Sequence, residues 1–525
     1  MRNLKAIVAV AVVAVMVMAG LGILALSSNG KQSGDTLTVA ISSDVNSWYL
    51  DRFPDGDGRF VWSQVYETLV RLDTDLEVIP GLADSWYTPD GGSTWIFNLT
   101  QGVEFHDGTE FTSEAVVFSY SDILSVKKWG ILSCINDTVA LDKHTVQFNL
   151  KWQVTLPYYL THVAWPIMSP NMATETGEWN GQVIGTGPFV FSQQVTDQEI
   201  RLVKNEDYWG EEPKLDDVVF KVVTDPTTRV FALQSGDVDM ILKVSENDVA
   251  QLESTEGIQV QEALTTFTDF LQFNTQDDEH NLTTSPFQDL DVRKAVAYAI
   301  DTDAIVEDLL MGHAEVAGGR TCSPNMMYDD PDLDVYEMDL AMASQLLNGS
   351  GWEMGDDGYR YKEGTRLKAS ILMTTEDAWA SRFGAMTDVI ADMLQDIGME
   401  VTVDKVPTST FNSMESAGDF SMILRTGYFV WGPYPKHYFL HVTNGVWSHF
   451  DNPDYTQLVT TADATTDPVE QEGMYHQLAE MVIDELPAFY IDHEHKIVAY
   501  RDHVKGYEIT SEDPWLNLDG VHLEY

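Results

Sequence analysis

The chain has 525 residues, with 83 acidic and 30 basic side chains, so its formal net charge is −53. Hydrophobic residues make up 44% and charged residues 22% of the chain, which is the composition of a globular protein and not of a disordered one. The acidity excludes a protein that grips the phosphate backbone of nucleic acids, and two cysteines are too few for a disulfide scaffold.

An apolar segment at residues 6–26 is the first feature of the chain, and it contains no charged or polar side chain. At a rise of about 1.5 Å per residue, a helix of this length matches the hydrocarbon core of a bilayer, about 30 Å thick. Arg2 and Lys5 precede it, which predicts a cytoplasmic N-terminus and an extracytoplasmic remainder. Residues 1–35 are therefore an N-terminal transmembrane helix with its tether, or a cleaved signal with export of the rest, and the length favours the uncleaved anchor.

Short strands and longer helices alternate along the rest of the chain. Runs of β-branched and aromatic residues predict strands at residues 37–41, 95–99, 218–223, 367–373, 400–406 and 420–424. Apolar residues at helical spacing predict helices at residues 63–72, 113–122, 225–234, 292–310, 338–347 and 386–397. This alternation predicts an α/β protein with mixed sheets.

Seven stretches of the sequence occur in a fixed order, which is more specific than any single motif. They are VYETLVRLD (65–73), residues 80–120, IGTGPFVF (184–191), residues 202–239, DVRKAVAYAID (291–301), QLLNGSGW (345–352) and ELPAFYI (485–491). In this order they resemble the extracytoplasmic solute-binding proteins of ABC importers, in the peptide and nickel group known as solute-binding family 5. The glycines of FHDG and GTGPF also have a local explanation, since they stand where a chain must turn between strands.

The resemblance implies a two-lobe, periplasmic-binding-protein-like fold of the clam-shell type (type II), with a hinge. Lobe I would comprise residues 36–270 and a return segment, 490–525, and lobe II residues 271–489. It also implies a receptor that does no covalent chemistry and uses no cofactor. Its partners would be a peptide or other small-molecule ligand, an ABC permease and separate ATPase subunits, with no nucleic acid.

The segment 426–440 (TGYFVWGPYPKHYFL) is the most site-like stretch of the chain. Its aromatic residues are interrupted by glycine and proline, which prevent a regular helix, and aromatic walls are common in ligand clefts. Comparison with the nickel-type members favours Trp431 and Tyr434 as cleft residues, and Tyr428 belongs to the same stretch. Trp165 stands where those members carry an arginine, and Arg59 is a candidate for a positive charge in the cleft.

The departures from the family bear on the solute. Residues 431–437 hold no carboxylate to pair with the amine of a peptide, and residues 162–166 hold no arginine to grip a chelator. These absences favour a neutral or cationic solute, unless Arg59, Lys127 or Lys128 supplies positive charge. A peptide is the leading prediction for the cargo, and a nickel chelate is the alternative.

Two other chemistries, metal binding and hydrolysis, have candidate residues in the sequence. His493 and His495 would share one face of a strand, but spacing alone supplies no third or fourth metal ligand, so no metal site is predicted. A surface-anchored hydrolase that uses paired carboxylates is the alternative from another class, although no G-x-S-x-G nucleophile motif occurs.

Overall fold

The computed structural model describes residues 35–49, 56–125, 130–275, 285–375, 380–426, 434–435, 439, 450, 452–465, 467–511 and 515–525. The apolar segment at residues 6–26, predicted to span the membrane, lies outside these residues. Among the helices that the structure does describe, none combines the length and the apolar character needed to cross a bilayer.

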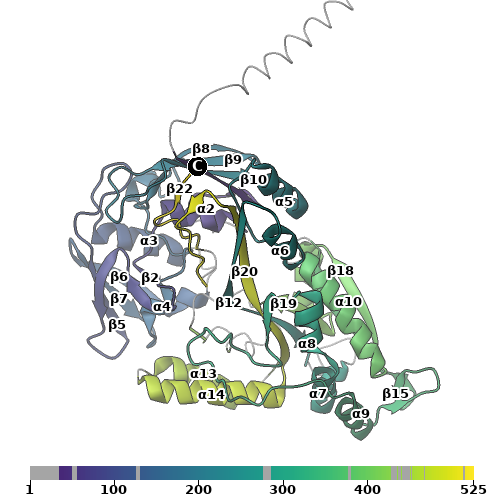
Figure 1. Ribbon diagram of the computed structural model, residues 1–525. Helices are drawn as coiled ribbons and strands as arrows, with labels where there is room; N and C mark the ends of the chain where they lie inside the picture. The colour runs from purple at the N-terminus through teal and green to yellow at the C-terminus, as the bar shows by residue number, and fades with distance from the viewer. Residues whose placement is uncertain are drawn as a thin grey trace, which may run out of the picture.

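One large mixed sheet runs through the whole molecule (Figure 1). Its strands lie in the order β18, β17, β19, β12, β20, β11, β1, β10, β9, β8, and β13 pairs with β20 beside this path. In the same order, their bounds are Glu400–Val406, Lys368–Thr374, Met422–Thr426, Ile258–Phe273, Ala488–Arg501, Met240–Leu242, Thr36–Ile41, Asp217–Val222, Glu199–Lys204 and Phe189–Val195, with β13 at Ala314–Val316.

Two long antiparallel strands, β12 and β20, connect the halves of this sheet. The last part of β20 pairs with β11, which leads on to β1 and β10, whereas the last part of β12 pairs with β19. Both strands are rich in β-branched and aromatic residues, which favours long extended segments. They therefore cross from one half of the molecule to the other.

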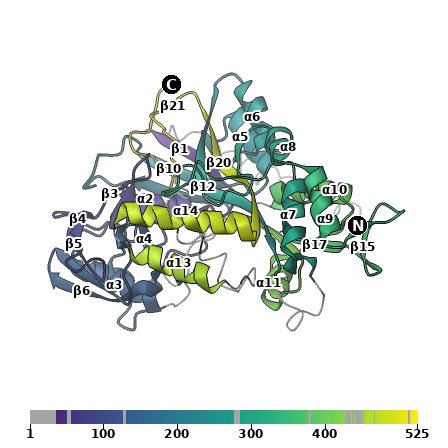
Figure 2. The same ribbon diagram turned by 90° about the horizontal axis from the view of Figure 1, so that it is seen from below.

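Separate hydrophobic cores fill the two halves. The first core covers parts of residues 37–242, 317–333 and 488–523 and also takes in the helices α13 (Pro453–Ala464) and α14 (Pro468–Glu485). The second core covers residues 271–424 and 486–491. A smaller core lies between β1, β11 and two helices, α5 (Pro226–Ser235) and α6 (Glu246–Glu253), on the other face of the sheet. Figure 2, which views the molecule from below, shows α13 and α14 side by side in front of the large sheet.

The remaining elements surround these cores. A four-stranded sheet in the order β4, β5, β7, β6 covers the far side of the first half, and three small sheets complete the molecule. The strands are β2 (Val70–Leu72), β3 (Val78–Pro80), β4 (Ala83–Tyr87), β5 (Thr94–Leu99), β6 (Ile135–Asp142), β7 (Thr145–Leu150), β14 (Glu353–Met354), β15 (Arg360–Lys362), β16 (Thr365–Arg366), β21 (Val504–Lys505) and β22 (His522–Leu523). The helices are α2 (Gly58–Val65), α3 (Ser113–Ser125), α4 (Leu156–Tyr159), α7 (Leu290–Ala299), α8 (Thr302–Ala304), α9 (Leu340–Gly349), α10 (Ala380–Asp396) and α11 (Thr408–Ala417).

The predicted α/β architecture with mixed sheets is confirmed, and most predicted elements fall within two residues of the observed ones. Asp225 caps α5 by accepting from the backbone N–H of Thr228, and Gly236 ends that helix at φ +82°. Two predictions are wrong. Residues 63–72 are the end of α2 followed by β2, and residues 292–310 are broken near Asp301, whose side chain caps a new helix by accepting from the N–H of Ala304.

Candidate functional site

The carboxyl end of β1 lies in the middle of the first half of the sheet. β1 pairs in parallel with β10 on one side and with β11 on the other. Val39 and Ile41 face the core that contains α2, whereas Ala40 faces the core that contains α5 and α6. The helices that follow these strands thus cover opposite faces of the sheet. Such a switch point leaves a crevice at the carboxyl ends of the strands, where ligands commonly bind.

Asp57 organises the chain at this end of β1. Its carboxylate accepts from the backbone N–H of Ser42 (2.5 Å) and forms an ion pair with Lys243 Nζ (2.8 Å). Burial alone would raise the pKa of Asp57, but Lys243 and Ser42 outweigh it, so the pKa is lowered. The turn before it requires Gly56, because φ is +57° and a Cβ there would lie 2.4 Å from Ser43 Oγ.

Arg59 follows two residues later, in the first turn of α2, and is 9% exposed. Its Nε donates to the carbonyl of Gly56 (2.9 Å). Burial, and next the charge of Arg59, hold the pKa of His162 well below its ordinary value. Since His162 Nδ1 accepts from the N–H of Ala164 (3.0 Å), the neutral ring carries its proton on Nε2. Arg59 therefore lies beside an uncharged histidine.

The two crossing strands are irregular where they leave the first half. Their register shifts between Leu264 and Thr268, and again between Asp269 and Phe270. Side chains satisfy the backbone there, because Thr265 Oγ1 donates to the carbonyl of Glu494 (2.9 Å). Thr268 Oγ1 forms a hydrogen bond with His493 Nδ1 (2.9 Å). A bulge of this kind bends a strand and increases its twist.

Arg382, in the first turn of α10, joins this bulge to both halves. Its Nε donates to Asp269 Oδ2 (2.8 Å) on β12, and its Nη2 contacts Asp492 on β20. Its Nη1 contacts Glu246, the first residue of α6. Both aspartates are fully buried, and the arginine side chain is only 10% exposed. One guanidinium thus links the second half to both crossing strands and to a helix of the first half.

The carboxylates around Arg382 outnumber its charge. Glu494 on β20 is also buried, and it lies beside Asp269 without an ion pair to the arginine. Burial, together with the charge of Asp269, raises the pKa of Glu494 well above its ordinary value. Burial likewise raises the pKa of Asp492, against the opposing effect of Arg382. We infer that Glu494 holds a proton, since of these carboxyls it alone lacks a bond to the arginine.

Of the predicted aromatic residues, two are buried in a core and two lie outside the described residues. Tyr434 is 2% exposed and belongs to the first core, where its ring stacks on Tyr158 (5.8 Å, 17°) and its hydroxyl accepts from Gln471 Nε2 (2.8 Å). Trp165 is also buried in that core. Trp431 and Tyr428 lie outside the described residues. The structure therefore brings Tyr434 and Trp165 into one core and places Arg59 apart from them, at the end of β1.

The histidines of β20 take part in local contacts. His493 is fully buried, and burial, aided by Arg320, lowers its pKa to about 3. His495 Nδ1 lies 3.4 Å from Glu262, which also contacts His313 Nδ1 (2.8 Å). Within the described ranges, no group of three or more potential ligands has the geometry to hold a metal ion.

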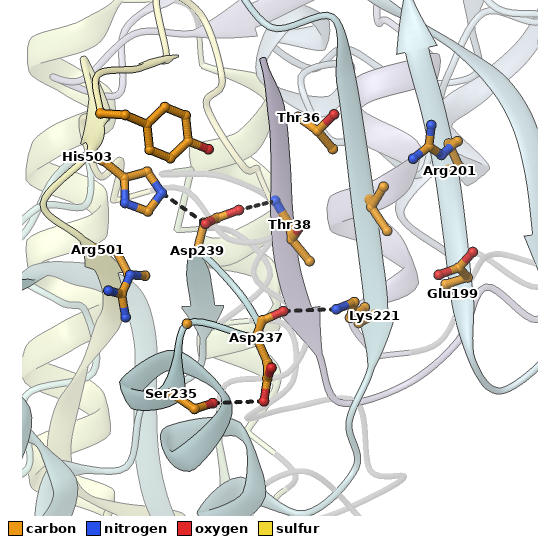
Figure 3. Close-up of a pocket in the computed structure, with 13 residues that line it drawn as sticks. Thr36, Thr38, Glu199, Arg201, Lys221, Ser235, Asp237, Asp239, Arg501 and His503 are labelled. Atoms are coloured by element: carbon orange, nitrogen blue, oxygen red, sulfur yellow. Dashed lines mark hydrogen bonds and ion pairs between the residues drawn. The ribbon is translucent and has the colours of Figure 1, made fainter. Parts of the chain in front are cut away.

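A cavity of about 660 Å³ lies at the opposite end of β1 (Figure 3). Most of its charged groups already interact with one another or with the backbone. Lys221 donates to the carbonyl of Asp237 (2.8 Å), Asp239 contacts His503 (2.9 Å), and Arg501 donates to the carbonyl of Leu233 (3.0 Å). Neither Arg59 nor Arg382 lines this cavity. It is separate from the switch point at the carboxyl end of β1.

Residues 77–448 match the family model described as bacterial extracellular solute-binding proteins, family 5 middle. The chain belongs to this family. The resemblance recognised in the sequence motifs is thereby confirmed, and an extracytoplasmic, exported protein is the location that the family supports.

Relatives within family 5 agree with this assignment. The nickel-binding periplasmic protein of Escherichia coli is 29% identical over 82% of this chain and 84% of its own length. The dipeptide-binding protein of the same organism is 25% identical over 94% of this chain and 96% of its own. Both are substrate-binding transport proteins and not enzymes, which confirms the non-enzymatic prediction and leaves the hydrolase alternative without support.

Solved structures of family 5 share the fold. NikA from Brucella suis, in complex with Fe(III)-EDTA, matches with a TM-score of 0.84 and 21% identity, over 93% of this chain and all of its own. The oligopeptide-binding protein AppA from Bacillus subtilis, in complex with a nonapeptide, matches with a TM-score of 0.77 and 24% identity, over 94% and 100% of the two chains. The two-lobe periplasmic-binding-protein fold is thus established.

Sequence reasoning missed the cluster around Arg382. The only signal was the presence of acids inside otherwise apolar strands, in TDFLQF and YIDHEH. Buried acids require partners, so these acids predict a cation nearby. Which of the 30 basic residues supplies it is not readable from spacing, because Arg382 stands more than a hundred residues from either aspartate.

Proposed function

We propose that this protein is the solute-binding receptor of an ABC importer that captures peptides or related small solutes outside the membrane. It would deliver them to a permease powered by separate ATPase subunits. The observation that carries the proposal is the pair of crossing strands, β12 and β20, which connect two separately packed halves in a member of family 5.

Capture would depend on closure of the two lobes. A ligand shifts such an equilibrium only by the difference between its affinities for the closed and the open state. The register shifts at Leu264–Thr268 offer a place where both crossing strands can bend. We place lobe I at residues 36–270 and 490–525, and lobe II at residues 271–489, of which α13 and α14 pack against the core of lobe I.

The solute would lie between the lobes, against aromatic and charged side chains. We retain Trp431, Tyr428 and Arg59 as proposed ligand contacts, and Tyr434 and Trp165 as proposed residues of the same site. The position of Arg59 at the carboxyl end of β1 supports its inclusion, since this is where open α/β sheets bind ligands. Tyr434 and Trp165 are buried in the first core and would support the wall of the site from behind.

Peptide and nickel chelate are the two cargoes that the relatives suggest. Dipeptide-binding and oligopeptide-binding proteins match over nearly the whole chain, which supports a peptide. The nickel-binding periplasmic protein of Escherichia coli supports the chelate, as does NikA from Staphylococcus aureus, solved with Ni(L-His)2.

Thermal unfolding with each candidate solute tests the proposal. A receptor at a hundredfold excess over Kd is stabilised by about 2.7 kcal/mol, and the solute is recovered unchanged by mass spectrometry. Di- to nonapeptides form one arm, and nickel with free histidine forms the other. If neither arm nor a broader panel of nutrients raises the midpoint, the receptor proposal fails. Turnover of any solute would also contradict it.

We further propose that residues 6–26 anchor the protein in the cell membrane, with residues 27–35 as a tether. Alkaline carbonate extraction of cell membranes tests the anchor, because a protein with a spanning helix resists extraction and a peripheral protein does not. Release of a mature chain that begins after residue 26 would instead establish a cleaved signal peptide.

A further inference from the structure

The helices α13 and α14 form a hairpin whose root lies in the second half. At the end of α14, Arg293 of α7 donates from Nε and Nη2 to the carbonyl of Glu485 (3.1 and 2.7 Å). Tyr336 donates its hydroxyl to the carbonyl of Ile483 (3.0 Å), and Ile483 packs against the second core. At a rise of about 1.5 Å per residue, the 18 residues of α14 extend about 27 Å from this root.

The other end of the hairpin, where α13 leads into α14, contacts the first half. Figure 2 shows α4 beside this end. Tyr159, the last residue of α4, donates its hydroxyl to Asp463 Oδ1 (2.8 Å) near the end of α13. Tyr159 is 2% exposed and Asp463 is 3% exposed. A carboxylate buried to this extent requires a hydrogen-bond donor, so this contact between the halves is specific.

A second contact lies next to the first. The ring of Tyr434 stacks on Tyr158 of α4 (5.8 Å, 17°). Gln471 Nε2 donates both to the hydroxyl of Tyr434 (2.8 Å) and to the carbonyl of Ala462 (2.8 Å), and thereby connects Tyr434 to the end of the hairpin. Adjacent tyrosines of α4 thus contact the hairpin end and the residue bound to it.

The position of these contacts makes them dependent on the orientation of the two halves. Because the hairpin is rooted in the second half, rotation of that half about the crossing strands moves the far end of the hairpin away from α4. Burial, and next the charge of Asp463, raise the pKa of Tyr159 well above its ordinary value, so the phenol keeps the proton that it donates. A contact made in only one of two states shifts the equilibrium toward that state.

We propose that the hydrogen bond between Tyr159 and Asp463 is a clasp that holds the two lobes of the receptor closed, with the α13–α14 hairpin as its arm. Tyr159 is a positioning residue, which acts on the solute through the fraction of the protein that is closed. Apparent affinity is proportional to the binding-competent fraction, so the clasp raises the affinity for every solute by the same factor. This inference rests on the proposed receptor function and adds a control of closure to it.

The variant Tyr159→Phe removes the donor and keeps the ring. We expect its affinity to be about tenfold lower, the range of a lost hydrogen bond to a charged group, by the same factor for each solute that binds. Isothermal titration of the full chain with di- to nonapeptides, and with nickel and L-histidine, measures it. Small-angle scattering of the ligand-free variant should give a larger radius of gyration than the wild type.

Tyr120→Phe is the matched control. Tyr120 lies on α3, is fully buried in the first core, and its hydroxyl has no hydrogen-bond partner among the described residues. Removing this hydroxyl changes no contact between the halves, so the affinity and the radius of gyration should equal those of the wild type.

Asp463→Asn tests the other side of the clasp and serves if Tyr159→Phe does not fold. The amide keeps the shape and accepts a weaker hydrogen bond, so we expect a smaller loss of affinity with the same change in scattering. The double variant should lose no more affinity than Tyr159→Phe alone, because both changes act through one bond. Additive losses would overturn the inference.

The remaining outcomes separate the clasp from the receptor function. A loss confined to one solute would mean that Tyr159 contacts that solute, and the inference would be wrong. An unchanged affinity and radius of gyration in Tyr159→Phe would overturn the clasp and leave the receptor function intact. If no solute binds the wild type, the receptor proposal fails, and scattering alone decides the clasp: a larger radius in the variant supports it, and an equal radius overturns it.

Discussion

Arg59 and Arg382 are both buried arginines, yet their surroundings are opposite. Arg382 contacts Asp269, Asp492 and Glu246, and a fourth carboxyl, Glu494, lies beside them. Arg59 has no carboxylate within ion-pair distance among the described residues. The first arginine is neutralised by the fold and stabilises it, whereas the second has no carboxylate partner among the residues that the structure describes. The difference teaches that a buried cation indicates binding only when the protein itself has not neutralised it.

Replacing Arg382 should have the largest effect on stability. Arg382→Met leaves two fully buried aspartates without their cation, and the expected loss is about 3–5 kcal/mol in the free energy of unfolding. Urea unfolding followed by fluorescence measures it. Arg201→Met is the control, because this half-exposed pair with Asp217 contributes less than about 1 kcal/mol. Equal losses in the two variants would show that the Arg382 cluster is not structural.

Replacing Asp57 should have the next largest effect. Asp57→Asn removes the counter-ion of Lys243, with an expected loss of about 2 kcal/mol at neutral pH. Since the folded state lowers the pKa of Asp57, this contribution is complete above the unfolded pKa of about 3.9 and is lost as the pH falls through the folded value. Chemical unfolding of both proteins from pH 6 to pH 3 checks it. A loss that is constant over this range would contradict the ionised pair.

Glu494, the buried carboxyl beside Arg382, makes the free energy of unfolding depend on pH in the direction opposite to that of Asp57. The raised pKa of Glu494 means that the folded state keeps a proton that the unfolded chain releases above about pH 4.3. Its contribution to stability is therefore full below that value and decreases as the pH rises toward the folded pKa. Glu494→Gln lacks this dependence, so the variant should gain on the wild type by up to about 1.4 kcal/mol per pH unit.

Unfolding in urea from pH 5 to pH 8 measures this difference. Glu315→Gln is the control, since Glu315 is exposed on β13, paired with the same strand, and its replacement should leave the pH dependence of the wild type unchanged. Parallel pH profiles of Glu494→Gln and the wild type would place the proton on another group of the cluster.

Replacing Arg59 should have the smallest effect on the ligand-free protein. Arg59→Gln loses one hydrogen bond to Gly56 but also removes a charge that has no carboxylate partner among the described residues, so the free energy of unfolding should change by less than about 1 kcal/mol. The same urea experiment as for Arg382 makes the contrast direct. A loss of several kcal/mol would mean that the fold does neutralise Arg59, and the two arginines would no longer differ.

Much of the fold could be predicted because its signals are local. The strand at residues 37–41 and the helix capped by Asp225 follow from alternation and from a cap that acts within three residues. The helix predicted over residues 292–310 fails because Asp301 offers the backbone a competing cap in the middle of an apolar pattern. The order of the strands in the large sheet could not be predicted, because it depends on pairing between segments that are far apart in the sequence.

The candidate site also has features that the sequence predicts and features that depend on long-range contacts. Arg59 could be singled out because it follows a glycine-rich turn just before a recognised motif. The pairing of its neighbour Asp57 could not be predicted, since the partner of Asp57 is Lys243, nearly two hundred residues away. Tyr434 was selected as an aromatic of a cleft-like segment, but aromatic residues serve cores and clefts equally, and composition does not distinguish the two uses. Trp431 and Tyr428 stay predictions.

The cavity at the start of β1 has a consequence for protein engineering. Thr36 at the beginning of the first strand and Tyr525 at the end of the chain line the same cavity, and Figure 1 shows the C-terminus at this end of the molecule. The ring of Tyr525 stacks on His503 (4.8 Å), which contacts Asp239, the acceptor for the N–H of Thr38. A short peptide could therefore join Tyr525 to Thr36 in a variant without residues 1–35, and new ends opened in a surface loop of the second half would give a circularly permuted domain whose crossing strands remain uncut.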